Sequence, residues 1–238
     1  MNKLLKPLTK DTLIEAKTKY NFFETPKHHG EYIYELHNPK NKLKIIDICC
    51  GMGSLVDPWY KNDHDITLIE LNEKLIPLLK EKYPKANIIN DDFLKMDILL
   101  ENYDVILCNP PFNNTEIKKV YSYFFCKILT QLSTYSTLYF ICPKMWYNDQ
   151  LLINIEHYEN AKWYHNKFGC IELHSNEFRF NNKMIERMIE SKIIYKDFIK
   201  QYIPNKFTIE PYYEFRYLRD IFDFETTQCK CGLFMITR

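Results

Sequence analysis

Short apolar runs separated by polar stretches recur along the chain from residue 44 onward. The runs with the length and composition of buried strands cover Lys44 to Cys49, Ile66 to Glu70, Asn87 to Asn90, Val105 to Cys108 and Thr137 to Cys142. Helix-like segments lie between them. Strands that alternate with helices predict a parallel sheet covered on both faces, in which ligands bind beyond the carboxyl ends of the strands.

The segments between the strands carry helical patterns. The first covers Ser54 to Tyr60, the second covers Glu73 to Tyr83, and the third covers Glu116 to Leu132. Pro77 falls inside the second pattern and is expected to kink that helix. The pattern becomes less regular beyond Asp149.

A chain of 238 residues with one such sheet predicts a single domain over residues 1–238. Residues 1–43 are expected to form an N-terminal helical segment. Residues 176–220 separate an expected sixth strand, Cys170 to His174, from a terminal seventh strand, Gly232 to Thr237. We interpret this stretch, rich in Tyr, Phe, Lys and Arg, as an insertion that takes part in substrate recognition.

Composition narrows the protein class. The net charge of +1 gives no global preference for a polyanion, although a local basic face would still suit one. No apolar run approaches the roughly 20 residues of a membrane-spanning helix, and the first residues lack the apolar core of a secretory signal, so an intracellular protein without membrane contact is expected. Cys229 and Cys231 have no second pair of matching spacing, so no metal site is predicted.

A glycine turn follows the first expected strand. Gly51 and Gly53 let the backbone approach a ligand closely, Asp47 precedes them, and Glu70 ends the next strand, where a carboxylate can bind both hydroxyls of a ribose. A dinucleotide site would want a third glycine. The plainer alternatives are that Asp47 braces the loop and that Glu70 is a solvated charge.

Asn109-Pro110-Pro111-Phe112 follows the fourth expected strand directly. An aromatic amine is a poor nucleophile because its lone pair is conjugated with the ring. The side-chain carbonyl of Asn109 and the backbone carbonyl of Pro110 can accept its hydrogens and stabilise the charge that develops as it reacts. The prolines restrict the loop, and Phe112 offers a ring on which a flipped base can stack. The alternative is an ordinary turn with Phe112 in the core.

These motifs together resemble class I S-adenosylmethionine-dependent methyltransferases that modify the N6 amine of adenine. The spacing D-x-x-x-G-x-G from Asp47 to Gly53 is similar to their cofactor loop, and Asn109 to Phe112 resemble their N-P-P-[FYW] catalytic motif. The resemblance covers roughly residues 20 to 180. It implies a Rossmann-like α/β fold with a mainly parallel seven-stranded sheet, and S-adenosylmethionine as the cofactor.

The resemblance also implies roles for further residues. Thr25, in an element like F-x-T-P, would contact the methionine end of the cofactor, and Asp92-Phe93 would border its adenine, with Asp91 as an alternative contact. The full predicted cofactor site consists of Thr25, Asp47, Cys49, Gly51, Gly53, Glu70, Leu71, Asp92, Phe93 and Asn109. A Pro-terminated loop at Thr25 and a plain helix cap at Asp92 are the alternatives.

On the substrate side, Lys144 and Trp146 follow the fifth expected strand, and Phe178 resembles a late aromatic wall of the base pocket. The expected partner is nucleic acid, DNA rather than RNA. The chain lacks a separate target-recognition domain, which leaves open RNA, a homodimer on a short DNA site, or a specificity subunit. Rival readings are protein glutamine N5 methylation, rRNA adenine dimethylation, which usually has N-[LI]-P-[YF], and a catalytically silent homologue.

Overall fold

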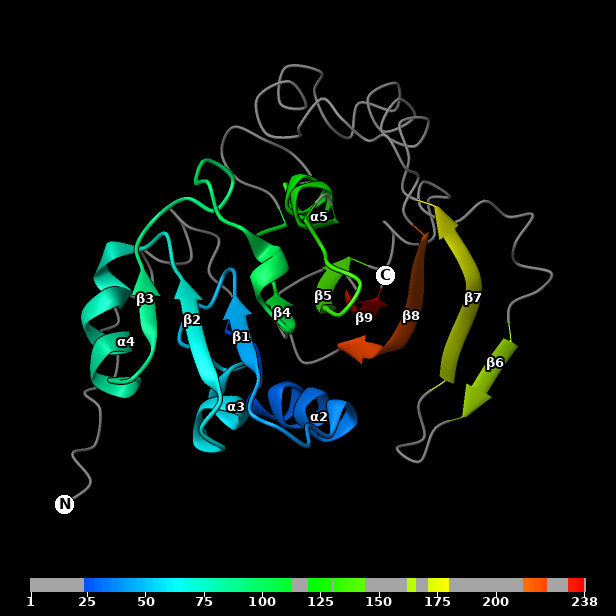
Figure 1. The fold of residues 1–238 in the computed structure, drawn as a ribbon, viewed down its shortest axis with the longest axis horizontal. Helices are drawn as coiled ribbons and strands as arrows, with labels where there is room; N and C mark the ends of the chain where they lie inside the picture. Colours follow the sequence, from blue (N-terminus) through cyan, green and yellow to red (C-terminus); the bar gives the residue numbers. More distant parts are fainter. Residues whose placement is uncertain are drawn as a thin grey trace.

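A single mixed sheet runs through the whole computed structural model, which describes residues 24–112, 120–129, 131–143, 162–165, 171–179, 212–221 and 231–237. Its strand order is β3-β2-β1-β4-β5-β9-β8-β7-β6 (Figure 1). The first half is parallel and consists of β1 (Lys44–Asp47), β2 (Asp65–Ile69), β3 (Asn87–Ile89), β4 (Val105–Cys108) and β5 (Thr137–Pro143). Each of these strands was predicted within two residues.

The second half of the sheet is antiparallel. It consists of β6 (Lys162–His165), β7 (Ile171–Arg179), β8 (Tyr212–Ile221) and β9 (Cys231–Thr237), and β9 pairs with β5. The Rossmann-like α/β fold is confirmed, but within the described residues the sheet has nine strands where seven were expected. The end of the predicted insertion, residues 212–220, belongs to β8 and lies between β7 and β9.

Two apolar layers cover the parallel strands. Helix α5 (Tyr121–Leu129) packs its aromatic and aliphatic side chains against one face, with Ile46, Ile106 and Phe140. Helices α2 (Lys27–His37), α3 (Asp57–Lys61) and α4 (Ile76–Lys82) cover the other face, where Ile45, Leu107 and Ile141 lie. Successive strand residues point to opposite faces, so these strands supply apolar side chains to both layers.

The helix boundaries differ from the predicted ones for local reasons. Residues 51–56 form turns, so α3 begins at Asp57 instead of Ser54. A short 3₁₀ turn, Glu73–Leu75, precedes α4, and Pro77 lies in the first turn of α4. The backbone N–H groups of the first turn have no partner within the helix, so a proline is tolerated there and does not kink the helix.

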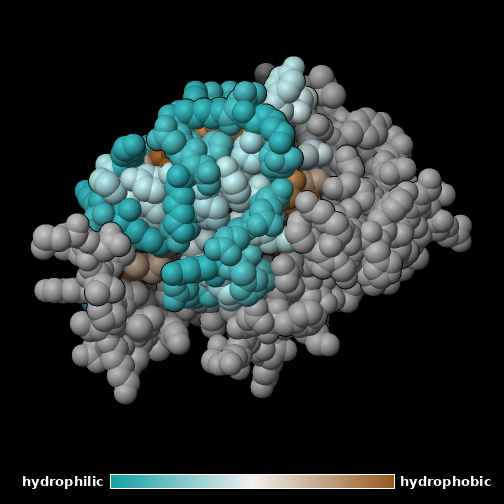
Figure 2. Space-filling model, turned by 90° about the horizontal axis from the view of Figure 1, so that it is seen from below, coloured by the Kyte–Doolittle hydropathy of each residue, from teal (hydrophilic) through white to brown (hydrophobic). Residues whose placement is uncertain are grey.

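The outer surface of this layer is polar. Figure 2 shows the molecule from below Figure 1, the side on which α2 and α3 lie, and its described atoms are predominantly hydrophilic. No helix in the described ranges is long and apolar enough to cross a bilayer.

Candidate active site

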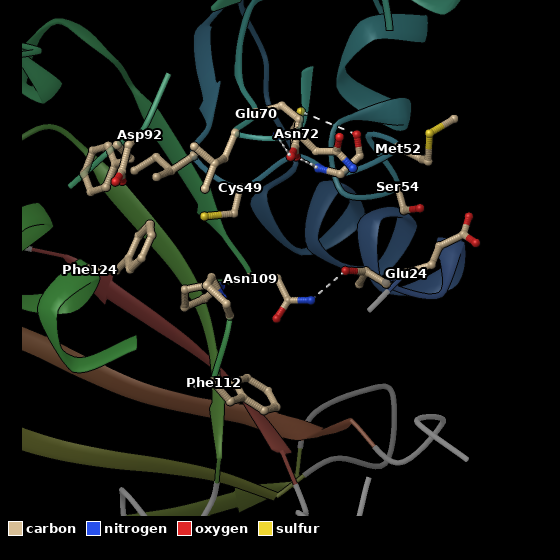
Figure 3. Close-up of a pocket in the computed structure, with 18 of the residues that line it drawn as sticks. Glu24, Cys49, Met52, Ser54, Glu70, Asn72, Asp92, Asn109, Phe112 and Phe124 are labelled. Carbon is tan, nitrogen blue, oxygen red and sulfur yellow. Dashed lines mark hydrogen bonds between the residues drawn. The ribbon is translucent and has the colours of Figure 1, made fainter. Parts of the chain in front are cut away.

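A cavity opens at the carboxyl ends of β1, β2 and β4, where the sequence placed the ligand site. Its walls contain Glu24, Thr25, Ile48, Cys49, Cys50, Gly51, Met52, Ser54, Glu70, Leu71, Asn72, Asp91, Asp92, Phe93, Asn109, Pro110, Pro111, Phe112 and Phe124. Most of the predicted cofactor residues and all four residues of the predicted catalytic motif are therefore brought together. In Figure 3, Asn109 lies between Phe112 on one side and Glu70 with Asn72 on the other.

Glu70 connects the glycine turn to the end of β2. One carboxylate oxygen accepts a hydrogen bond from the Gly51 N–H at 2.8 Å, and the other accepts from the Asn72 N–H at 2.7 Å. Burial raises the pKa of Glu70, and these backbone N–H groups oppose the rise. A carboxylate oxygen has two lone pairs, so each oxygen can still accept a ribose hydroxyl.

The two glycines of this turn are required for different reasons. Gly51 lines the cavity and has a φ of 52°, a conformation that residues with a Cβ rarely adopt. Gly53 has a φ of 78° and does not line the cavity; a Cβ there would collide with the ring of Tyr83. Gly53 is therefore required by packing inside the protein, and its predicted contact with the cofactor stays a prediction.

Helix α4 braces the same turn from behind. Lys82 Nζ donates to the Met52 carbonyl at 2.8 Å and pairs with Asp57 at 3.0 Å. The Tyr83 hydroxyl lies 2.9 Å from the Gly53 carbonyl and 2.5 Å from a carboxylate oxygen of Asp57. These contacts hold the turn in a fixed shape before any ligand binds.

Asp47 lies behind the cavity wall and does not line it. Its side chain is 1% exposed, and neither carboxylate oxygen has a hydrogen-bond partner of ordinary geometry among the described residues. Burial raises the pKa of Asp47 to about 8; the N–H of Cys49 opposes this rise and the charge of Glu70 adds to it. Its predicted role in binding the cofactor is not visible at the cavity surface and stays a prediction.

Asn109 is held by a contact that the sequence did not reveal. Its amide nitrogen donates to the Thr25 hydroxyl at 2.8 Å, from a segment 84 residues away in the chain. Thr25 sits directly before Pro26 and α2, and Gly30 in α2 lies so close to the backbone of Ser54 and Leu55 that a Cβ would not fit. One amide hydrogen of Asn109 is therefore engaged, and its carbonyl oxygen, which has no hydrogen-bond partner among the described residues, remains available as an acceptor.

Aromatic residues form the remaining walls. Phe112 lines the cavity, is half-buried, and packs edge-to-face on Tyr121 of α5 at 6.2 Å between ring centroids. Phe93 is buried and stacks on Phe124 of α5 at 5.4 Å. Asp92 accepts a hydrogen bond from the Leu94 N–H at 3.0 Å, which is the contact expected of a loop cap.

The remaining predicted substrate residues fall elsewhere. Lys144 and Trp146 lie outside the described residues, and Phe178 belongs to β7, where its backbone pairs with Tyr213 but its side chain is not described. Cys231 is buried in β9, and Cys229 lies outside the described part. Within the described ranges, no group of His, Cys, Asp or Glu side chains is arranged to hold a metal ion.

The residues around Glu70 suit a nucleoside on an apolar support. Asn72 is 1% exposed, and its side-chain amide nitrogen has no partner among the described residues, so a buried donor is left for a ligand. Leu71 is 53% exposed at the rim, an unusual exposure for leucine in a cavity wall. A carboxylate, an unpaired amide and apolar side chains are the set that a ribose and a flat base require.

Comparison with known proteins identifies the family. The family model described as "Methyltransferase small domain" matches residues 32–168, more than half of the chain. Ribosomal RNA small subunit methyltransferase A of Mesomycoplasma hyopneumoniae is 35% identical over 85 residues, which are 35% of this chain and 32% of that protein. An rRNA adenine N-6-methyltransferase of Lysinibacillus sphaericus is 31% identical over 103 residues, 42% of each chain. The matches thus span about a third to two fifths of the length of these relatives.

Solved structures agree on the fold. The crystal structure of the 23S rRNA methyltransferase ErmE has a TM-score of 0.53 at 14% identity, and the match covers 92% of this chain and 70% of ErmE. A dimethyladenosine transferase from Plasmodium falciparum has a TM-score of 0.51 at 11% identity, covering 91% of this chain and 63% of that one. The chain belongs to the methyltransferase small domain family, and S-adenosylmethionine is its cofactor.

Proposed function

We propose that this protein methylates the N6 amine of adenine in RNA. The observation that carries the proposal is the orientation of Asn109, whose amide nitrogen is engaged by Thr25 while its carbonyl oxygen is left as an acceptor in a cavity that Phe112 also lines. The sequence alone favoured DNA. RNA is preferred here because the relatives that match are named as rRNA methyltransferases.

The chain's own residues divide the work within the cavity. Glu70, Asn72 and Leu71 would hold the nucleoside part of the cofactor, and Thr25 would face its methionine end. Bound S-adenosylmethionine supplies a methyl group on a sulfonium sulfur, which keeps the bonding pair when the methyl is transferred. Phe112 would support the flipped adenine through its ring face.

Asn109 would act on the adenine amine itself. Its carbonyl oxygen, together with the backbone carbonyl of Pro110, would accept the two amine hydrogens and draw the nitrogen toward a tetrahedral geometry. The nitrogen lone pair is then directed at the methyl carbon, and the excess amine proton passes to water after transfer. The hydrogen bond to Thr25 fixes the side chain before substrate arrives, so little reorganisation is needed.

Methyl transfer to a panel of polymers tests the proposal. Radiolabelled S-adenosylmethionine is incubated with the protein and, separately, with unmethylated rRNA, duplex DNA, single-stranded DNA and protein extract. Label in RNA is the expected result. Label confined to DNA would restore the DNA reading, label confined to protein would favour glutamine methylation, and cofactor binding without any transfer would contradict the proposal for the isolated chain.

A further inference from the structure

Lys127 occupies an unusual position on α5, the helix that follows the catalytic motif. It is 4% exposed in a layer of aromatic and aliphatic side chains, although lysine is almost never fully buried without partners. Burying its ammonium is costly unless its donors are satisfied. The groups that bind this ammonium therefore compensate for the cost of burying it.

Three hydrogen bonds of its ammonium lead to one loop. Lys127 Nζ donates to the backbone carbonyls of Phe93 at 2.7 Å, Leu94 at 3.3 Å and Met96 at 2.6 Å. An ammonium has three N–H donors, so these carbonyls together match its donor capacity. The same ammonium lies 4.9 Å from the centroid of the Phe93 ring, within the range of a cation–π contact.

The loop that Lys127 holds is a wall of the cofactor cavity. Asp91, Asp92 and Phe93 line the cavity, and Phe93 is also stacked on Phe124, one turn before Lys127 on α5. One helix therefore fixes both the backbone and the aromatic ring of this wall. Lys127 does not line the cavity itself, so it acts through the loop that does.

We propose that Lys127 is a positioning residue that sets the Asp92–Phe93 wall for the adenine of S-adenosylmethionine and so contributes to recognition of that base. The proposal rests on the placement of the cofactor adenine at Asp92–Phe93, and it does not depend on which polymer is methylated. Without Lys127, three backbone carbonyls lose their donor, and the loop can shift away from the base.

Calorimetric binding of S-adenosylhomocysteine tests this role independently of methyl transfer. Lys127→Met keeps an unbranched apolar side chain but removes the charge and the donors, and we expect it to weaken binding by about tenfold or more. Lys95→Met is the matched control, because Lys95 belongs to the same loop but its side chain is 72% exposed. Its ion pair with Asp92, at 3.5 Å, lies at the surface. That variant should bind within about twofold of the unaltered protein.

Base discrimination separates positioning from general damage. Asp92 can accept a hydrogen bond from the adenine amine but not from the carbonyl of hypoxanthine, so the unaltered protein should prefer S-adenosylhomocysteine to its inosine analogue. Lys127→Met should narrow this preference, whereas a loss of fold would weaken both ligands equally. Unchanged affinity and an unchanged preference in a folded Lys127→Met protein would overturn the proposal, and so would equal binding of both ligands by the unaltered protein.

Discussion

At the scale of single residues, the buried carboxylate of Asp47 makes stability depend on pH. Its pKa in the folded protein is about 8, above the ordinary value of 3.8, so between these values the folded state keeps a proton that the unfolded chain has lost. Keeping this proton stabilises the folded state. The stabilisation is fully present below pH 3.8 and is lost as the pH rises toward about 8.

Asp47→Asn removes this dependence because an amide does not ionise. We expect the variant to gain stability relative to the unaltered protein as the pH rises from 5 to about 8.5, by at least about 1 kcal/mol. Urea unfolding followed by circular dichroism at several pH values measures the gain. The exposed Asp65→Asn serves as control, and parallel pH profiles for Asp47→Asn and the unaltered protein would refute the buried ionisation.

Glu70 is the residue on which the nucleoside half of the cofactor site depends. Glu70→Gln replaces one acceptor oxygen by a donor that faces a backbone N–H, at Gly51 or Asn72. We expect at least about tenfold weaker binding of S-adenosylhomocysteine by calorimetry. Glu73→Gln, an exposed neighbour in the following 3₁₀ turn, should bind normally, and a Glu70→Gln protein that does so too would remove Glu70 from the site.

At the scale of elements, the parallel strands were the most predictable part of the fold. β4 has the predicted bounds, Val105–Cys108, because a fully buried strand is a continuous apolar run with clear polar limits. The ends of these strands carry Glu70 and Asn109, so their meeting at one edge also followed from the pattern. The position of these residues at the strand ends predicted the cavity better than the motifs they belong to.

Helix α5 shows why other site residues were missed. Its sequence, YSYFFCKIL, is apolar on nearly every side, so no polar face tells which residues point at the cavity. The places of Phe124 and Lys127 next to the cavity wall therefore follow only from the way the helix packs. Asn72 was missed for a different reason, since its unpaired amide nitrogen depends on the three-dimensional arrangement around the turn after β2.

The loop that carries Phe112 gives a prediction at this scale. Phe112 lines the cavity and also packs against both apolar layers. Its ring could therefore support a bound base or stabilise the core, and a substitution distinguishes these two roles. Phe112→Ala should weaken RNA binding by roughly 1–3 kcal/mol and leave S-adenosylhomocysteine binding nearly unchanged. Phe112→Tyr, which keeps the ring, should resemble the unaltered protein. A large fall in melting temperature with normal RNA affinity would favour the core reading.

At the scale of the whole molecule, the antiparallel half of the sheet was the least predictable. The alternation of aromatic and charged residues from Tyr213 to Tyr217 has the period of a strand, and this segment is β8. Its place between β7 and β9 depends on long-range pairing, which local pattern does not determine.

The most direct test of the proposed function is the identity of the methylated nucleoside in RNA treated with the protein and with Asn109→Ala. Unmethylated rRNA is incubated with S-adenosylmethionine, digested to nucleosides and analysed by mass spectrometry. We expect N6-methylated adenosine with the unaltered protein. With the variant, we expect a loss of at least about a hundredfold in rate at nearly unchanged affinity for S-adenosylhomocysteine. Methylation of another nucleoside, or equal rates for both proteins, would contradict it.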